Sequence, residues 1–174
     1  AFEAEIKAAG GEADYMHLDA ASAADWQAAV AHASERFGEL DILINNAAIL
    51  VPRVPVEERT EEEWDRVMAV NAKGVFLGTK TAIPAMRNAG GGSIVNISSI
   101  AGIGQALTQE PAYAASKGAV DTITIGLSQE VAREAIRVNA VSPGIIETDI
   151  HARAGAPDRL ALHAALRRRR LRGG

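Results

Sequence analysis

The stretch PAYAASKG at residues 111–118 holds two side chains that could move a proton together. Tyr113 lies four residues before Lys117, and in a helix this spacing stacks both side chains on one face. A free tyrosine titrates near pH ~10, so it is a poor base at neutral pH. A cation one helical turn away favours the tyrosinate and lowers its pKa, which would suit a general acid/base. The alternative is an ordinary helix surface with a solvated lysine.

Composition limits the other kinds of chemistry. The 174-residue chain has no cysteine, which excludes disulfides, thiolate metal sites and a cysteine nucleophile, and fits a cytoplasmic protein. Its net charge of -4 argues against nucleic acid or an anionic membrane as the main partner. The four histidines show no metal-ligand spacing, so no metal site is expected. No apolar run approaches the length of a membrane span.

Helical and extended segments alternate along the chain, which favours parallel strands joined by right-handed crossovers. The sequence therefore predicts a doubly wound α/β sheet. Helices are expected over 1–9, 22–38, 60–88 and 111–134, and strands over 13–19, 40–45, 93–99 and 136–144. Ser22 and Thr60 are predicted N-caps, each with an acidic residue in the capping-box position three residues later. The apolar run 40–45 is typical of a strand buried on both faces, and Pro84 could kink the long helix.

Polar and turn-forming residues follow the predicted strands. In open parallel sheets, ligands bind beyond the carboxyl ends of the strands. These ends carry Asp19, Asn45-Asn46, Ser98-Ser99 and Pro143-Gly144. The helix that follows 93–99 has an apolar stripe through Val120, Thr124, Leu127 and Val131. Tyr113 and Lys117 extend this stripe, so we expect the pair to face inward at the same edge of the sheet as Ser99.

Together these motifs resemble the short-chain dehydrogenase/reductase family. The matching segments are NNAA at 45–48, VNAKGVF at 70–76, GSIVNISSIAG at 92–102, YAASK at 113–117 and PGIIET at 143–148. The resemblance implies a partial Rossmann fold and hydride transfer between NAD or NADP and a secondary alcohol or ketone. It also implies a homodimer or homotetramer, formed through the helices 60–88 and 111–134, with a small-molecule substrate.

The family's pattern implies four catalytic residues, which are Asn71, Ser99, Tyr113 and Lys117. Tyr113 would exchange the proton with the substrate, and Ser99 would hydrogen-bond the substrate oxygen. Ser98 competes for that role, but the family places its serine directly before an apolar-Ala-Gly stretch, which selects Ser99. In the family, the matching asparagine supports the lysine through water, and the resemblance implies the same role for Asn71. Without the resemblance, Ser99 could be a strand-end cap and Asn71 a surface residue.

The resemblance also implies a set of cofactor-binding residues. Asp19 would lie at the adenine, and Lys117 would also touch the nicotinamide ribose. The full set is Asp19, Ala20, Asn45, Ala47, Tyr113, Lys117, Pro143, Gly144, Ile146 and Thr148. Plain turns are the alternative for Asn45-Asn46 and for Pro143-Gly144.

Two parts of the family's pattern do not appear in the sequence. One is the glycine-rich turn with its first two strands, where the choice between NAD and NADP would be made. The other is the segment after ETDI, where the chain becomes rich in Ala, Arg and Leu. We expect residues 1–174 to be a single, incomplete dinucleotide-binding domain, from truncation, a frame shift or a partial gene. Without the glycine turn, this chain alone is expected to be inactive or nearly so.

Two alternatives remain open at this stage. The predicted strand 13–18 would lack the strands that join it to 40–45, so it either pairs with 40–45 or leaves an open edge. The second hypothesis for function is a non-catalytic assembly or interaction subunit that uses the helices 60–88 and 111–134.

Overall fold

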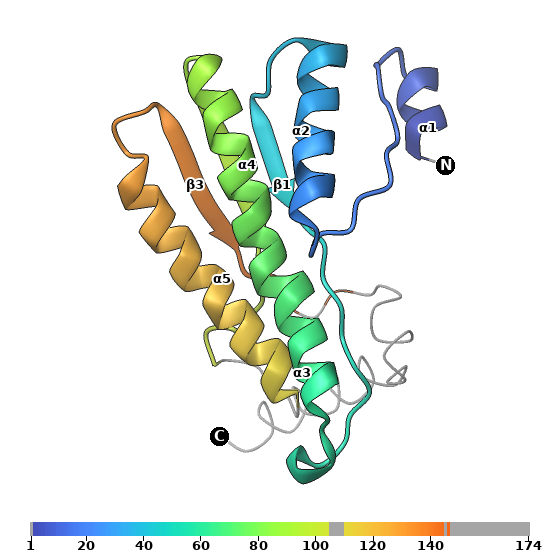
Figure 1. Cartoon of the computed structure of the whole chain (residues 1–174), viewed down its shortest axis with the longest axis vertical. Coiled ribbons are helices and arrows are strands. Elements are labelled where there is room, and N and C mark those ends of the chain that lie inside the picture. Colours follow the sequence, from blue (N-terminus) through green and yellow to red (C-terminus); the bar gives the residue numbers. More distant parts are fainter. Residues whose placement is uncertain (1, 105–109, 145, 147–174) are drawn as a thin grey trace, which may run out of the picture.

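Three parallel strands form the sheet of this protein, in the order β1-β2-β3. The computed structural model describes residues 2–104, 110–144 and 146. The elements are α1 (Phe2–Ala8), α2 (Ala23–Phe37), β1 (Ile42–Asn45), the 3-10 turn η1 (Val56–Glu58), α3 (Glu61–Met68), the π-helical turn η2 (Ala69–Lys73), α4 (Gly74–Asn88), β2 (Gly92–Ile97), α5 (Pro111–Glu130) and β3 (Ile136–Val141). The parallel pairing predicted for the strands over 40–45, 93–99 and 136–144 is confirmed (Figure 1).

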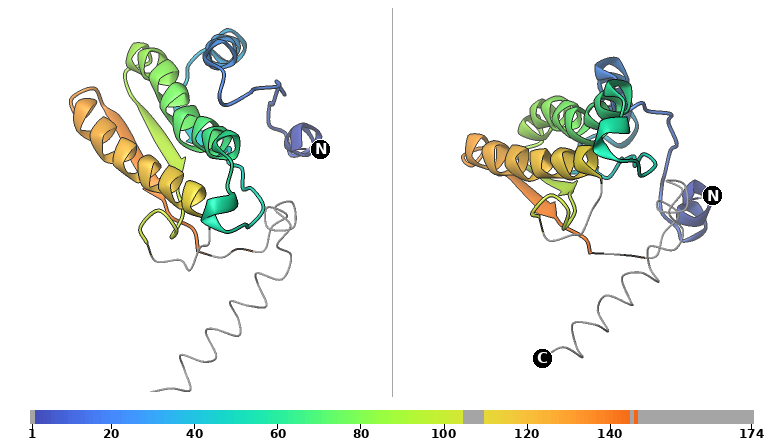
Figure 2. Two further views of the ribbon diagram at one scale, coloured as in Figure 1. Left: turned by 60° about the horizontal axis from the view of Figure 1, so that its bottom comes forward. Right: turned by 90° about the horizontal axis from the view of Figure 1, so that it is seen from below.

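Helices α2, α4 and α5 lie over one face of the sheet (Figure 2). Seven buried side chains fill the space between this layer and the strands: Ala82, Ile83, Met86, Ile94, Val131, Ile136 and Val138. The other face of β1 is open among the described residues, with Ile42 62% and Ile44 59% exposed. The prediction that 40–45 is buried on both faces is therefore wrong. A strand with helices on only one side buries alternate residues.

The predicted helix starts are confirmed. The Ser22 hydroxyl accepts from the Asp25 amide, and Thr60 and Glu63 form a reciprocal capping box. Pro111 occupies the first turn of α5, as expected. This helix ends at Glu130 rather than at 134, and the chain then turns through Ala135, which has a positive φ of 55°. None of the helices in the described part is long and apolar enough to cross a membrane.

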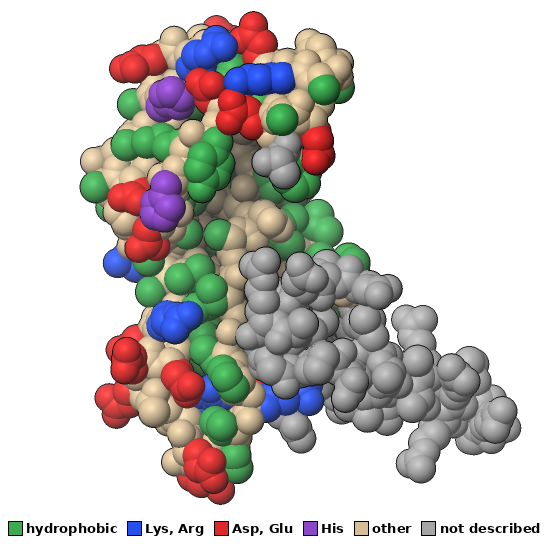
Figure 3. All heavy atoms as spheres, turned by 90° about the vertical axis from the view of Figure 1, so that its right-hand side faces the viewer, with side chains coloured by type: hydrophobic (Ala, Val, Ile, Leu, Met, Phe, Trp, Pro, Cys, Tyr) green, Lys and Arg blue, Asp and Glu red, His purple; other side chains and the backbone are tan. Residues whose placement is uncertain are grey.

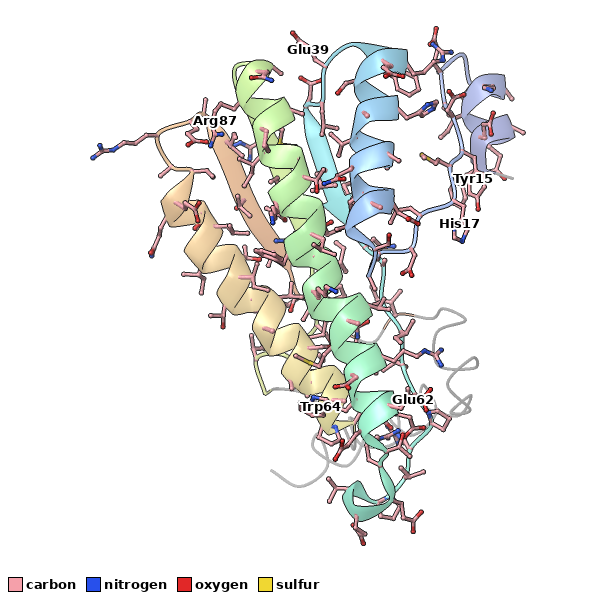
Figure 4. The ribbon with its side chains drawn as sticks, in the orientation of Figure 1. Tyr15, His17, Glu39, Glu62, Trp64 and Arg87 are labelled. Atoms are coloured by element: carbon pink, nitrogen blue, oxygen red, sulfur yellow. The ribbon has the colours of Figure 1, made fainter. Side chains whose placement is uncertain are left out.

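The segment 13–19 does not form the predicted strand. It runs irregularly between α1 and α2, and Tyr15 and His17 lie along it (Figure 4). It does not pair with β1, so the alternative in which it pairs with 40–45 is wrong. No described strand lies beside that edge of β1. A strand requires main-chain partners, and this segment instead makes side-chain contacts with α2. Arg36 of α2 pairs with Glu12 and Asp14. Charged side chains of both signs gather at the end of the molecule that carries α1 and α2 (Figure 3).

A buried polar chain links the sheet to the helices above it. The Asn45 amide donates to Asn96 Oδ1 at 2.8 Å and to Thr79 Oγ1 at 3.2 Å. The Asn96 amide donates in turn to Thr124 Oγ1 at 2.9 Å. Because buried polar groups require partners, these contacts fix the positions of β1 and β2 relative to α4 and α5. They thereby hold the edge of the sheet at which the candidate site lies.

Candidate active site

Lys117 is buried one helical turn after Tyr113. Its side chain is 2% exposed, so it is not a solvated surface lysine. Its Nζ donates to the carbonyl oxygen of Ile97, the last residue of β2, at 2.6 Å. The same atom lies 5.8 Å from the centroid of the Tyr113 ring. Burial lowers the pKa of Lys117 to about 8, against the opposing effect of the Asp121 carboxylate. Lys117 thus joins the carboxyl end of β2 to the tyrosine.

The loop after β2 packs directly on α5. Ser98 donates from Oγ to the main-chain oxygen of Lys117 at 3.1 Å and is buried. Ser99 is half-buried, and its Oγ accepts from the Ala101 amide at 3.2 Å. A Cβ on Gly102 would lie 2.7 Å from the carbonyl carbon of Lys117, so only glycine fits here. Both serines therefore lie at the edge that carries Tyr113 and Lys117. The Ser98 hydroxyl is hydrogen-bonded to the main chain of α5.

Asn71 lies in the π-helical turn η2 and is fully buried, so it is not a surface asparagine. Its side chain accepts from the Ile49 amide at 2.8 Å and donates to the Ile49 oxygen at 3.0 Å. It also donates to Ser116 Oγ at 3.1 Å, and Ser116 Oγ donates to the main-chain oxygen of Tyr113 at 2.7 Å. π-turns inside helices are frequent at functional sites. The hydrogen bonds of the Asn71 side chain thus reach the backbone of Tyr113 through Ser116.

Ser116 is the residue that the sequence interpretation missed. It stands inside the quoted YAASK motif, but no role was assigned to it. One signal in the sequence could have indicated its burial. Ser116 lies four residues before Val120, which belongs to the apolar stripe of this helix, so it borders the buried face.

A cavity of about 130 Å³ brings three predicted cofactor residues together. Its lining comes from α2 and the segment before it, from the end of β1 and from the α3–α4 region, and comprises Leu18, Ala20, Trp26, Ile44, Asn45, Asn46, Ala47, Val70, Gly74 and Val75. Gly74 allows the close approach, since a Cβ there would lie 3.0 Å from the Ala20 oxygen. The Asn45 amide, however, is turned toward Thr79 and Asn96.

The remaining predicted cofactor residues lie elsewhere. Asp19 does not line the cavity, and its carboxylate accepts from the Ala21 amide at 2.9 Å. Pro143 follows β3, and its oxygen accepts from the Ile100 amide at 3.1 Å, which joins it to the loop after β2. Gly144 and Ile146 are exposed. Thr148 lies outside the described residues.

Comparison with known proteins agrees on one family. A family model described as short chain dehydrogenase matches residues 1–158. Cyclopentanol dehydrogenase from Comamonas sp. is 45% identical over 145 residues, which are 83% of this chain and 57% of that protein. Trans-4-hydroxycyclohexanecarboxylate dehydrogenase from Sinomonas cyclohexanicum is 45% identical over 138 residues, covering 79% of this chain and 52% of that protein. The chain thus spans little more than half the length of these relatives.

Two solved structures have the same fold. Gluconate 5-dehydrogenase from Burkholderia cenocepacia, in complex with NADP and tartrate, superposes with a TM-score of 0.81 at 33% identity, over 91% of this chain and 63% of that one. Levodione reductase superposes with a TM-score of 0.78 at 36% identity, over 82% of this chain and 55% of that one.

Proposed function

Because this chain belongs to the short chain dehydrogenase family, we propose that it forms the catalytic part of an oxidoreductase. The enzyme transfers a hydride between NAD or NADP and a secondary alcohol or ketone. The observation that carries the proposal is the buried Lys117, whose Nζ lies 5.8 Å from the Tyr113 ring at the carboxyl edge of the sheet. A buried cation beside a tyrosine supplies what a general acid/base at neutral pH requires.

Each residue has a distinct role in this mechanism. The Tyr113 hydroxyl takes the alcohol proton during oxidation and returns it during reduction. Lys117 stabilises the tyrosinate, and Ser99 holds the substrate oxygen by a hydrogen bond. Asn71 acts through Ser116 to hold the backbone of Tyr113.

The cavity beside β1 suits part of a dinucleotide. Most of the side chains that line it are apolar, with two asparagines among them, and Gly74 lets α4 lie close to Ala20 at its wall. Ala20, Asn45 and Ala47 would border the bound dinucleotide there, and Pro143, Gly144, Ile146 and Thr148 would border its nicotinamide half. The cofactor supplies the hydride chemistry. The gluconate 5-dehydrogenase structure contains NADP, and both NAD and NADP are candidates for this chain.

The names of two relatives suggest the first substrates to test. One is a cyclopentanol dehydrogenase and the other acts on trans-4-hydroxycyclohexanecarboxylate, so both names contain a ring alcohol. We infer an alicyclic secondary alcohol as the substrate class.

The test is turnover by the natural full-length protein with cyclopentanol or cyclohexanol and either dinucleotide. Tyr113→Phe should abolish turnover and leave the fold unchanged, because only the acid/base hydroxyl is lost. The matched control is Tyr15→Phe, since Tyr15 is exposed and lies outside the candidate site. If both Tyr113→Phe and Tyr15→Phe keep the activity of the wild type, the mechanism is refuted.

Exposed apolar side chains on α3, α4 and α5 support a proposal about assembly. Trp64 on α3, Phe76 on α4 and Ile125 on α5 are exposed large apolar side chains. A homodimer or homotetramer through 60–88 and 111–134 would cover them, in a protein that we place in the cytoplasm. Sedimentation of the natural protein and of Ile125→Lys tests this, and an unchanged mass in the variant argues against the interface. A non-catalytic interaction subunit would use the same surface, but it would not bind NAD(H) or NADP(H) in a titration.

A further inference from the structure

A buried ion pair joins the start of α5 to the segment before α3. Arg59 Nη2 lies 3.0 Å from Glu110 Oε2, and the two side chains are 5% and 2% exposed. The same nitrogen donates to the Pro52 oxygen at 2.8 Å, and Nη1 donates to Glu63 Oε2 at 3.0 Å. Removing either partner would leave a buried charge, so the chain strongly disfavours arrangements that separate them. Arg59 therefore holds three segments in one relative position.

Two of these contacts flank the candidate site. Glu110 is the N-cap of α5, its main-chain oxygen accepts from the Ala114 amide at 3.0 Å, and Tyr113 lies in that same first turn. An open cleft of about 470 Å³ lies beside this turn, lined by residues 53–56 and by Pro111. Pro52 and Glu110 immediately precede the two walls of this cleft. The Arg59 guanidinium thus contacts Pro52 and Glu110, the residues directly before the two walls.

We propose that Arg59 is a positioning residue, which through Glu110 and Pro52 sets the place of Tyr113 and the width of the cleft beside it. This inference rests on the proposed function and adds to it that the alcohol reaches Tyr113 through that cleft. Arginine suits the task because its planar fork donates in several fixed directions, whereas a lysine ammonium acts as a compact point charge. The cofactor cavity is lined by other segments, so Arg59 should affect the alcohol more than the dinucleotide.

The test replaces the pair in the natural full-length protein by Arg59→Met with Glu110→Met. This double variant removes both charges together and leaves no isolated buried ion. The matched control is Arg87→Met with Glu134→Met, an exposed Arg–Glu pair at 2.7 Å that also joins the α4 and α5 regions. Arg87 lies at the opposite end of the helical layer from Trp64 (Figure 4).

The kinetic readout separates positioning from simple stability. We expect the Arg59/Glu110 variant to lose about tenfold or more in kcat and to raise KM for the alcohol, because small displacements of a catalytic group cost that much. KM for the dinucleotide should change less than about twofold, and the Arg87/Glu134 control should keep all three constants. A variant with a lower Tm but unchanged kinetic constants overturns the proposal.

A second readout does not depend on activity. Amide hydrogen exchange at residues 114–116, near the start of α5, should accelerate about tenfold or more in the Arg59/Glu110 variant and not in the control. If the natural protein shows no nicotinamide-dependent turnover, the proposed function fails, and exchange alone decides whether Arg59 holds this turn. Exchange equal to that of the wild type overturns the inference. If the double variant does not fold, Arg59→Lys replaces it, and wild-type exchange in that variant has the same consequence.

Discussion

Replacing Lys117 by methionine should change how the stability of the protein depends on pH. Burial lowers the pKa of Lys117 from 10.5 to about 8, and at 1.36 kcal/mol for each pKa unit this corresponds to about 3 kcal/mol. Below pH 8 the ammonium is charged in both the native and the unfolded chain, and its burial opposes folding by that amount. Between pH 8 and 10.5 the unfolded chain binds more protons than the native one, so the free energy of unfolding rises with pH.

Methionine keeps an unbranched side chain of similar length and removes the charge. The advantage of Lys117→Met over the wild type should therefore be largest at pH 7 and shrink by about 3 kcal/mol at pH 10.5. Urea unfolding followed by circular dichroism, at steps between these pH values, measures both proteins. A Tyr113→Phe background removes the nearby phenol, and Lys80→Met controls for the loss of an exposed lysine. A difference between the two proteins that stays flat from pH 7 to 10.5 would refute the assignment of a buried, charged Lys117.

Three further outcomes follow from the packing. Gly102→Ala should destabilise the protein by about 1–3 kcal/mol in urea unfolding, because its Cβ would lie 2.7 Å from a backbone carbon of Lys117; an unchanged midpoint would mean that the loop shifts freely. Asn96→Ala should cost about 1–3 kcal/mol by breaking the buried amide chain, whereas Asn139→Ala on the exposed face of β3 should cost less than about 0.5. Asn71→Ala should accelerate amide exchange around Ile49, and equal protection would contradict the contact seen here.

Local signals in the sequence predicted the elements well. Ser22 and Thr60 start their helices through contacts only three residues long, so a short stretch of sequence is sufficient. The apolar runs predicted the three strands that form the sheet. The segment 13–19 has a strand-like composition but no strand, because pairing depends on a neighbouring strand rather than on the segment itself.

The candidate site was predictable in part for the same reason. The spacing of Tyr113 and Lys117 and the apolar stripe beyond them indicated an inward-facing pair, and Lys117 is buried. The contacts that hold the pair were not predictable. The Asn71–Ser116 bond spans 45 residues and the Arg59–Glu110 bond spans 51, and nothing in either local sequence specifies the partner. Their catalytic and positioning roles stay predictions.

The π-helical turn at 69–73 has a consequence for the phase of the long helix. A π-turn accommodates one residue more than an α-turn, so side chains after it are rotated by about 100° relative to an unbroken α-helix. Val67 before the turn and Val75 after it are nevertheless both buried. Deleting a single residue from this turn would restore regular winding, yet it would swing the whole of α4 out of register with α3. Insertions and deletions at this point should therefore be far less tolerated than substitutions on the exposed surface of either helix.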